Sequence, residues 1–382
     1  MKGIILRNYQ GNELIRLFEG GQEVLPEQLI EPDYTNIVAA RDNNLVRLVS
    51  GNIEWSKDNG KTWISIANTY GTITNIHFFA SGRMMFCTNT NVYYTDDGIT
   101  INQSTIRDIN GNIATLSGYH FFQQRPLDRI VIVDGVEVHV FGDYIIGGTA
   151  SVWATDDGGE TVREIMRSGI TVSFRHIHQV CFNDWDKRFY VITGDGGNDC
   201  NVLRLTYNAG SFTYDRLVSG DNFKFGQLLF DRDFCYCITD YTGVGATKGI
   251  LRVPTSKMDR ATEYKYIYKQ TDIGSNVGIT TMCADANGKK IMALDINQPG
   301  YVLLALHGLE FRLIPVQNSA TKHFNIFTTG PDYNGRYYSA VAPFRATNEG
   351  CALVYPTVEL TAWMAKNNLV WRSATTIDRL WE

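Results

Sequence analysis

Proline is scarce in this chain, and long apolar runs are missing from it. Only 9 of the 382 residues are proline, against 20 tyrosines and 19 phenylalanines. Strands favour aromatic residues and largely exclude proline, so this balance favours a β-rich fold. No stretch of the sequence reaches the roughly 18 apolar residues of a membrane span. The apolar run near Met1 is too short for a secretory signal peptide, so we expect a protein that is cytoplasmic or leaves the cell by another route.

A basic surface is also missing. Lysine and arginine number 35 against 40 aspartates and glutamates, which gives a net charge of -5. Broad nucleic-acid binding needs a basic face, so the sequence indicates no nucleic-acid partner. With 44% hydrophobic and 20% charged residues, the composition is that of an ordinary globular protein with ample core.

The seven cysteines form no recognised metal or redox motif. Cys235 and Cys237 make a C-x-C pair, and no second pair completes a zinc site. We therefore expect buried free thiols, and neither a metal nor another cofactor.

One short segment matches a turn pattern at every fixed position. Residues 56–63 read Ser-Lys-Asp-Asn-Gly-Lys-Thr-Trp, which is S-x-D-x-G-x-T-W. Asp58 can accept hydrogen bonds from turn amides, and Gly60 can supply a positive φ angle. The pattern predicts a tight turn between two strands, with Thr62 and Trp63 beginning the second strand. Trp63 would then pack in the gap between neighbouring sheets.

Three weaker copies of this turn pattern follow along the chain. Their anchors are Asp96, Asp156 and Asn208, which continue from Asp58 at intervals of 38, 60 and 52 residues. The second copy keeps Asp, Gly and Thr, the third carries one extra residue before Thr, and the fourth has Asn for Asp. Such intervals are consistent with four-stranded units joined by loops of variable length.

Hairpin signals repeat along the whole chain, including the part where the turn pattern fades. Residues 228–238 and 282–294, for example, each read as two strands around a polar turn. Seven such units start near residues 35, 72, 118, 174, 223, 276 and 322. Six units is the alternative, if residues 322–365 complete an earlier one.

Repetition of such units predicts an all-β fold, a single β-propeller of four-stranded antiparallel blades, seven or alternatively six in number. The blades would occupy residues 35–357. One or more strands within residues 1–34 would close the ring, which removes exposed sheet edges. Residues 358–382 would form an apolar segment that docks on the propeller or on a partner.

The full match at residues 56–63 makes the chain resemble the BNR/Asp-box propellers, which include sialidases, xyloglucan-degrading glycosidases and many non-catalytic repeat proteins. In that superfamily the box lies on a peripheral turn, so the resemblance implies a structural role for its residues. These residues are Ser56, Asp58, Gly60, Thr62, Trp63, Asp96, Gly98, Asp156 and Gly158. The sialidase motif Phe-Arg-Ile-Pro does not occur in the sequence, which argues against sialidase activity.

The middle of the chain holds the candidate functional residues. His176 and His178 are two residues apart, so on a strand they would share a face. If that strand is the innermost one, both side chains reach the axial funnel, with Asp195 and Asp240 at corresponding positions of successive blades. The candidate ligand-binding residues are His176, His178, Asp195, Asp240 and Arg252.

Two interpretations of these histidines stay open at this point. The imidazoles could ligate a metal with Asp195, or act as acid and base on a sugar or uronate. The structural alternative is that His176 and His178 bond backbone carbonyls, while Asp195 caps a glycine-rich turn.

Three classes of function follow, and fold alone does not decide among them. The chain could be a non-catalytic structural or binding component of a larger assembly, a polysaccharide lyase or glycoside hydrolase acting around His176 and His178, or an intracellular scaffold factor. The first class is favoured, because the resembled propellers mostly work outside cells and this sequence shows no signal peptide. A bacteriophage virion or tail protein fits both observations, because it folds in the host cytoplasm and is released by lysis. Its partners would be other subunits of the particle and a protein or glycan.

Overall fold

The structure is a computed structural model. It describes residues 3–5, 16–19, 22–24, 37–67, 69–116, 130–145, 148–194, 196–230, 232–239, 249–269, 285–286, 289–295, 301–306, 310–315, 325–328, 337–342 and 351–354. These residues form strands, turns and short 3-10 segments, with no α-helix among them. In this described part, no helix is long and apolar enough to cross a membrane. The docking segment predicted at 358–382 lies outside the described residues.

Residues Met1–Asp33 form a compact unit of their own. Its strands β1 (Gly3–Ile5), β2 (Arg16–Glu19) and β3 (Gln22–Val24) pair in that order into a three-stranded antiparallel sheet. The closure of the ring by these strands stays a prediction.

The second unit, Tyr34–Glu382, is a series of sheets, each built mainly from strands that follow one another in sequence. The described residues of this unit hold seven sheets. The first contains β4 (Ile37–Arg41), β5 (Asn44–Val49), β6 (Asn52–Ser56) and β7 (Ile64–Ile66). The second contains β8 (Ile73–Phe78), β9 (Met84–Thr88), β10 (Val92–Thr95) and β11 (Asn102–Gln103).

The middle sheets are the best defined by their side chains. The third contains β13 (Val131–Val133), β14 (Val136–Gly142), β15 (Ser151–Thr155), β16 (Thr161–Arg167) and a fifth strand, β12 (Thr105–Arg107). The fourth contains β17 (Ile177–Asn183), β18 (Arg188–Thr193), β19 (Asn201–Asn208) and β20 (Ser211–Ser219). The fifth contains β21 (Phe225–Phe230), β22 (Phe234–Thr239), β23 (Gly249–Pro254) and β24 (Lys265–Lys269).

The last two sheets are described by their backbone. The sixth contains β25 (Asp285–Ala286), β26 (Lys289–Asp295), β27 (Tyr301–Leu306) and β28 (Glu310–Pro315). The seventh contains β29 (Asn325–Thr328), β30 (Tyr337–Ala342) and β31 (Cys351–Val354). The predicted all-β fold of four-stranded antiparallel sheets is confirmed, while the number of blades stays a prediction.

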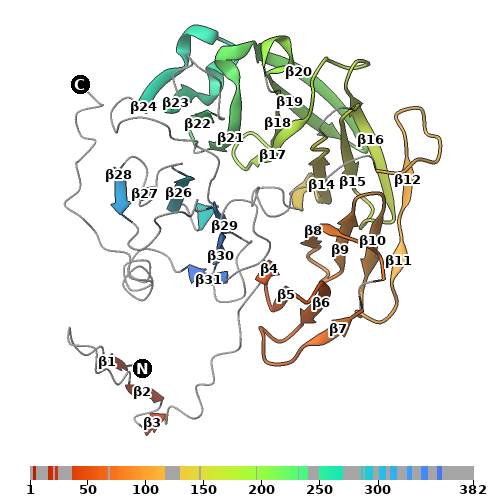
Figure 1. The fold of residues 1–382 in the computed structure, drawn as a ribbon, viewed down its shortest axis with the longest axis vertical. Coiled ribbons are helices and arrows are strands. Elements are labelled where there is room, and N and C mark those ends of the chain that lie inside the picture. The colour runs from red at the N-terminus through yellow and green to blue at the C-terminus, as the bar shows by residue number, and fades with distance from the viewer. Residues whose placement is uncertain are drawn as a thin grey trace. The chain divides into compact units, whose positions relative to one another are not determined.

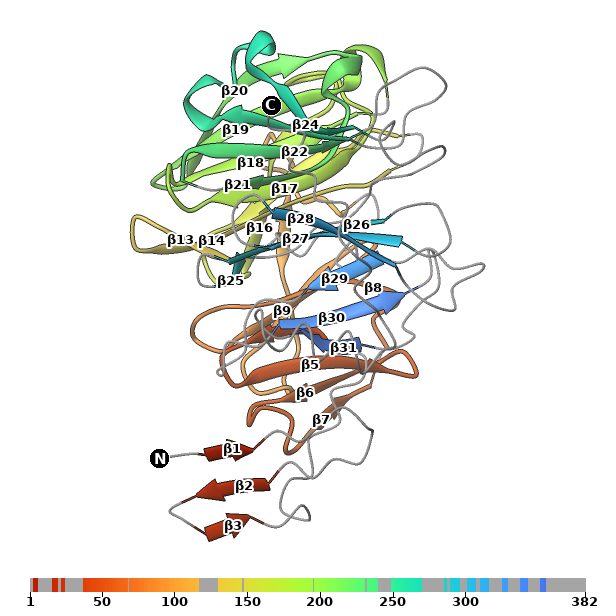
Figure 2. The same cartoon turned by 90° about the vertical axis from the view of Figure 1, so that its left-hand side faces the viewer.

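Strands on the inner side of neighbouring sheets lie next to one another. β4 contacts β8, β17 contacts both β14 and β21, and β30 contacts β4, so the seventh sheet adjoins the first. Figure 1 shows β4, β8, β17 and β21 on the inner side of their sheets, and Figure 2 shows the strands of the fourth and fifth sheets running side by side. Strands β4, β8, β17 and β21 each pair with a single strand of their own sheet, so one edge of each is unpaired there.

Strand β12 covers the outer edge of the third sheet. It precedes that sheet in sequence and pairs in parallel with β16, from Thr105 opposite Thr161 to Arg107 opposite Arg163. The Ser104 hydroxyl donates to the Gly159 carbonyl at 2.5 Å and fixes the start of this pairing. The outer edge of β16 is thus hydrogen-bonded to a segment that leaves the second sheet.

The hydrophobic core lies between neighbouring sheets. Trp55 of β6 is fully buried and its ring centre lies 5.8 Å from that of Phe78 in β8 of the next sheet. Trp63, predicted to fill this gap, is instead partly exposed beneath the Arg47 guanidinium, 4.2 Å away. The prediction for Trp63 is wrong because this residue precedes an outer strand, where water reaches one side. Trp55 lies on an interior strand that is covered on both faces.

Candidate functional site

Antiparallel pairing places the strand connections at two opposite ends of the sheets. We call one end the turn end; it carries the connections from first to second and from third to fourth strands. The other, the loop end, carries the connections from second to third strands and from one sheet to the next. At the loop end, second and third strands are joined by residues 50–51 and 89–91 in the first two sheets, but by 143–150, 194–200 and 240–248 in the next three. These loops are thus longer in the third to fifth sheets than in the first two.

The predicted turn at the start of the chain forms between β6 and β7. The Gly60 amide donates to Ser56 Oγ at 2.7 Å, and Asp58 accepts both the Thr62 amide at 2.8 Å and the Thr62 hydroxyl at 2.6 Å. Gly60 has a φ of 87°, which suits glycine. Partial burial raises the pKa of Asp58, but the bonds from Thr62 and Ser56 outweigh it and lower that pKa from 3.8 to about 2.

The second turn, between β10 and β11, uses a different aspartate from the predicted one. Asp97 Oδ1 accepts the Thr100 amide at 2.8 Å, and the Gly98 amide donates to Thr95 Oγ1 at 2.9 Å. Thr95 and Asp97 therefore repeat the bonds that Ser56 and Asp58 make in the first turn.

The third turn, between β15 and β16, shows the same shift. Asp157 accepts the Thr161 amide at 3.0 Å, and the Gly159 amide donates to Thr155 Oγ1 at 3.1 Å. The spacing from Thr155 to Thr161 equals that from Ser56 to Thr62, with no extra residue.

The predicted anchors Asp96 and Asp156 and the predicted Gly158 are thus wrong by one residue. The hydroxyl two residues before the aspartate sets the register, and threonine serves as well as serine. We call the three hydrogen-bonded segments, residues 56–62, 95–100 and 155–161, the Asp turns. The fourth copy is not one of them: Ala209 and Gly210, with φ of 46° and 87°, form a two-residue hairpin between β19 and β20.

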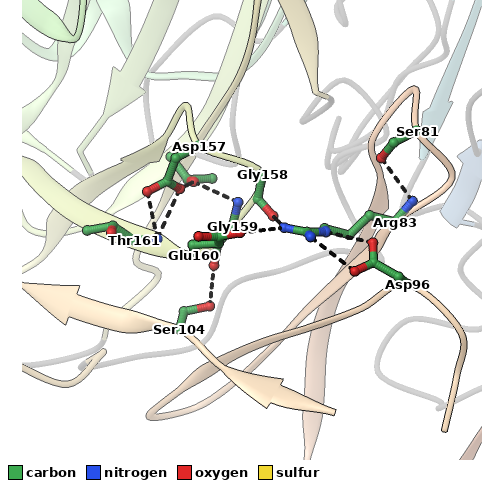
Figure 3. Close-up of polar contacts among 10 residues, drawn as sticks. Ser81, Arg83, Asp96, Ser104, Asp157, Gly158, Gly159, Glu160 and Thr161 are labelled. Atoms are coloured by element: carbon green, nitrogen blue, oxygen red, sulfur yellow. Dashed lines mark hydrogen bonds and ion pairs between the residues drawn. The ribbon is translucent and has the colours of Figure 1, made fainter. Parts of the chain in front are cut away.

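The displaced aspartate of the second Asp turn joins two sheets. Its carboxylate binds Arg83 through two bonds, from Nε at 2.8 Å and from Nη2 at 3.0 Å. Arg83 Nη1 reaches across to the Gly158 carbonyl at 3.2 Å and to the Glu160 carboxylate at 3.2 Å, in the third sheet (Figure 3). Asp96 therefore holds an arginine that links the second sheet to the third.

Equivalent positions in the other Asp turns also reach the following sheet. Lys57 donates to the Asp96 carbonyl at 2.8 Å, and Asp156 accepts the Tyr207 hydroxyl of β19 at 2.8 Å and Arg163 at 2.6 Å. The residue between the hydroxyl and the anchoring aspartate thus contacts the next sheet directly in the first and third turns, and through Arg83 in the second. The Asp turns are structural features of the turn end.

At the loop end, the predicted histidines lie at the start of β17 and are buried. His176 is 0% exposed and His178 is 3% exposed. Their Nε2 atoms lie 2.9 Å apart, while His176 Nδ1 faces the Ile145 carbonyl at 3.3 Å and His178 Nδ1 faces the Phe225 carbonyl at 2.7 Å. Tyr144 stacks on His176 with ring centres 4.2 Å apart.

The two imidazoles therefore tie the fourth sheet to both of its neighbours. His176 contacts a carbonyl that follows β14 in the third sheet, and His178 contacts the first residue of β21 in the fifth. This matches the structural alternative raised from the sequence for His176 and His178. Buried imidazoles whose ring nitrogens face carbonyls and each other are poorly placed to take a proton from a substrate.

The other candidate residues do not join this pair in the described structure. Asp195 and Asp240 lie outside the described residues. Arg252 lies toward the turn end, with its guanidinium 4.5 Å from the Phe234 ring centre. The grouping of Arg252 with the histidines is wrong because β23 starts at the loop end and Arg252 lies three residues further along it.

The loop that follows β18 is held close to the histidines. The Gly194 amide donates to the His176 carbonyl at 3.2 Å, and a Cβ on Gly194 would lie 2.5 Å from the Cys200 Cα atom, so only glycine fits. The Asn201 side chain donates to the Ser173 carbonyl at 3.1 Å, and the Ser173 hydroxyl donates to Asp199 at 2.9 Å. Side-chain bonds thus fix the exposed loop 196–199 against the preceding inter-sheet connection.

Metal ligation finds no support in the described part of the chain. No group of three or more histidine, cysteine or carboxylate side chains suited to a metal ion occurs there. Five cysteines, Cys87, Cys181, Cys200, Cys235 and Cys237, are buried free thiols, and Cys235 and Cys237 have their sulfurs 3.8 Å apart on β22.

Three buried amides were missed by sequence reasoning. Asn75, Gln179 and Gln227 lie on the inner strands β8, β17 and β21 and are at most 1% exposed. Each stands three residues before a phenylalanine, as in Asn-Ile-His-Phe at 75–78. That repeated spacing was visible in the sequence and identifies equivalent positions of three sheets.

Comparison with known proteins supports the fold alone. No protein-family model matches the chain, and no curated protein is similar to it. Among solved structures, YCF48 bound to D1 peptide has a TM-score of 0.52 at 12% identity, over 85% of this chain and 95% of that one. An extracellular domain of a one-component system from B. thetaiotaomicron has a TM-score of 0.50 at 13% identity, over 94% and 44%.

An ancestral GH74 enzyme likewise has a TM-score of 0.50 at 13% identity, over 92% of this chain and 50% of that one. These structural neighbours are β-propeller proteins. Together with the successive antiparallel sheets, they show that this chain is a β-propeller.

We predict that removing the carboxylate of the first Asp turn destabilises the propeller. Asp58→Ala leaves the Thr62 amide and hydroxyl without their acceptor, and we expect a loss of about 1 kcal/mol in the free energy of unfolding. Denaturant unfolding measures it. Lys61→Ala, in the same turn and exposed, is the matched control and should change little; an equal loss in both variants would contradict the role of Asp58.

The contribution of Asp58 should also depend on pH. Its pKa of about 2 in the folded chain lies below the ordinary value of 3.8, so its stabilisation is present above the ordinary value and is lost as pH falls toward 2. The stability difference between wild type and Asp58→Asn should therefore shrink as pH is lowered from 5 to about 2. A difference that stays constant over this range would show that the carboxylate charge contributes nothing.

Loss of the second histidine should weaken the contact between the fourth and fifth sheets. His178→Ala leaves the Phe225 carbonyl buried without this partner, and we expect a loss of roughly 2–3 kcal/mol in unfolding free energy. Chemical denaturation measures it, with exposed Trp185→Ala as the control. A variant as stable as wild type would mean that His178 does not join the sheets.

Proposed function

We propose that this β-propeller is a non-catalytic binding component of a larger assembly, and that it binds a protein partner through the loop end of its third to fifth sheets. The observation that carries this proposal is the lengthening of the loop-end connections in these sheets. Binding residues are commonly placed on loops that a rigid scaffold positions, and the sheets of a propeller supply such a scaffold.

The chemistry of the described loops suits a polar partner surface. Gly196, Gly197 and Asn198 are exposed in the loop after β18, and Asp221 and Asn222 are exposed in the next inter-sheet connection. The two segments are joined, because the Gly197 amide donates to the Asp221 carboxylate. Loops already held in place lose little conformational freedom on binding, which favours affinity.

The structural neighbour with a bound peptide gives separate support for a protein partner. That neighbour is YCF48 bound to D1 peptide, and its fold extends over 85% of this chain. A peptide partner is therefore favoured here over a glycan.

The enzymatic alternative, a polysaccharide lyase or glycoside hydrolase around His176 and His178, has weaker support. An acid–base residue must come within hydrogen-bond reach of the substrate proton. Both imidazoles are buried and face backbone carbonyls and each other, and this arrangement favours an inter-sheet role.

Two finer proposals accompany this function. The three Asp turns share the hydroxyl–x–aspartate bonding, and we propose that they are Asp boxes of the BNR type. We also propose a bacteriophage particle as the assembly, because buried free cysteines suit a protein that folds in the reducing cytoplasm of a host cell. Electron microscopy of the purified chain, alone and mixed with virion proteins, tests the second proposal. A chain that stays monomeric in both samples would contradict it.

The binding surface can be tested with peptides selected from a displayed random library. Asn198→Arg and Asn222→Arg place bulky charges on the loop end and should weaken peptide binding at least about tenfold, equivalent to roughly 1.4 kcal/mol. Fluorescence titration measures the affinities. Ile99→Arg is the matched control at the turn end, where Ile99 is 81% exposed, and it should bind as wild type does.

Two results would overturn the proposed function. One is weakening of peptide binding by Ile99→Arg but not by the loop-end variants. The other is cleavage of uronate-containing or neutral glycans by the purified chain that His178→Ala abolishes in a variant shown to be folded.

A further inference from the structure

The three buried amides occupy one structural position in three sheets. In the pairing of first and second strands, a register shift falls just before Asn75, just before Gln179 and just before Gln227. The same shift precedes Ala39 in the first sheet. An extra residue at an equivalent point of each inner strand is a β-bulge that re-aims the side chain after it.

The side chain at this position points toward the following sheet. Gln179 Oε1 accepts the Leu228 amide of β21 at 2.7 Å, from the fourth sheet to the fifth. His77, two residues after Asn75 and thus on the same face of β8, packs on His139 of β14, in the third sheet, with ring centres 4.2 Å apart. Asn75 and Gln179 therefore both face the next sheet along the chain.

Gln179 also shows what the position does for the neighbouring strand. Leu228 lies on β21, which pairs within its sheet only with β22, so half of its backbone groups point away from the ladder. The Gln179 amide oxygen satisfies one of them. An amide at this position can thus serve the unpaired inner edge of the next strand.

The amide groups at these positions retain hydrogen-bonding capacity that the described residues do not use. Both polar atoms of Asn75 and of Gln227, and Nε2 of Gln179, are buried without a hydrogen-bond partner among those residues. Buried side-chain amides are seldom left unsatisfied in proteins, because losing water without a replacement partner is unfavourable.

The buried amide N–H groups and oxygens define the chemistry of a partner that could bind them. Each primary amide presents two N–H donors and an acceptor oxygen. A cation would satisfy the oxygen only, and an anion would satisfy the N–H groups only. Water both donates and accepts, and it commonly fills buried polar sites of this kind.

We propose that Asn75, Gln179 and Gln227 form a set of internal hydration sites on the inner strands β8, β17 and β21, in which bound water hydrogen-bonds to each buried amide. These sites are separate from the loop-end surface and do not depend on the proposed function. They make the interior of the propeller polar where its sheets converge.

The test compares isosteric apolar variants of the full chain. Gln227→Met and Asn75→Leu keep the side-chain size but cannot hold water. Water oxygen-17 relaxation dispersion counts long-lived internal waters, and each variant should lose at least one. Because the hydrogen bond between water and the amide is lost, the thermal midpoint Tm should also fall, by roughly 2–4 °C.

The opposite signs would overturn the proposal. If the amides are simply unpaired, each substitution removes an unfavourable buried group, so Tm rises and the water count stays unchanged. A fall in Tm of the wild-type chain on adding a chelator would show that a metal ion, and not water, binds these amides. A bound cation at these amides in a crystal structure would show the same. Asn102→Leu, at an exposed amide of β11, is the matched control and should alter neither quantity.

If a variant fails to fold, the wild-type chain still decides the question. Its crystal structure should show ordered water within hydrogen-bond distance of Asn75 and Gln227. Protein atoms in that place, or no density at all beside both amides, would overturn the proposal.

Discussion

The packing of one sheet's face against the next is the constraint on which this propeller depends. Each sheet is too small to bury its own apolar side chains, so the core consists of the spaces between sheets. Trp55 against Phe78 is one example, and the cluster that joins β14, β17 and β18 is another. Polar contacts are arranged around these spaces: Arg83 bridges two sheets at the turn end, and His176 and His178 bridge three at the loop end. Position within the interface therefore decides the role of a residue more than its chemical type does.

Sequence reasoning identified the repeats because their signals are local. Hairpin turns and strand-forming residues depend on neighbours within a few positions, so five of the seven sheets start at residues 37, 73, 177, 225 and 325, close to the predicted 35, 72, 174, 223 and 322. In the other two, the described strands β13 and β25 start at residues 131 and 285, further from the predicted 118 and 276. The register of the Asp turns was missed because adjacent aspartates, such as Asp96 and Asp97, look equivalent in sequence. Only the hydrogen bonds of Thr95 and Thr100 distinguish them.

The candidate site was the least predictable part, since it depends on burial across sheets. The i, i+2 spacing of His176 and His178 correctly gave a shared location, and their rings do meet. Nothing in the local sequence shows that the carbonyls of Ile145 and Phe225 face those rings. Arg252 was misplaced for a related reason, because strand direction decides which end of the sheet a residue reaches.

Strand β12 has a consequence for how the chain is made. It lies earlier in sequence than the four strands it completes, so during synthesis it emerges before the sheet that needs it. When β16 forms, its outer edge meets a partner that is already present, and the third sheet presents no bare edge there to other nascent chains. The same overlap ties two repeats together covalently and by hydrogen bonds, so the second and third repeats are not interchangeable modules.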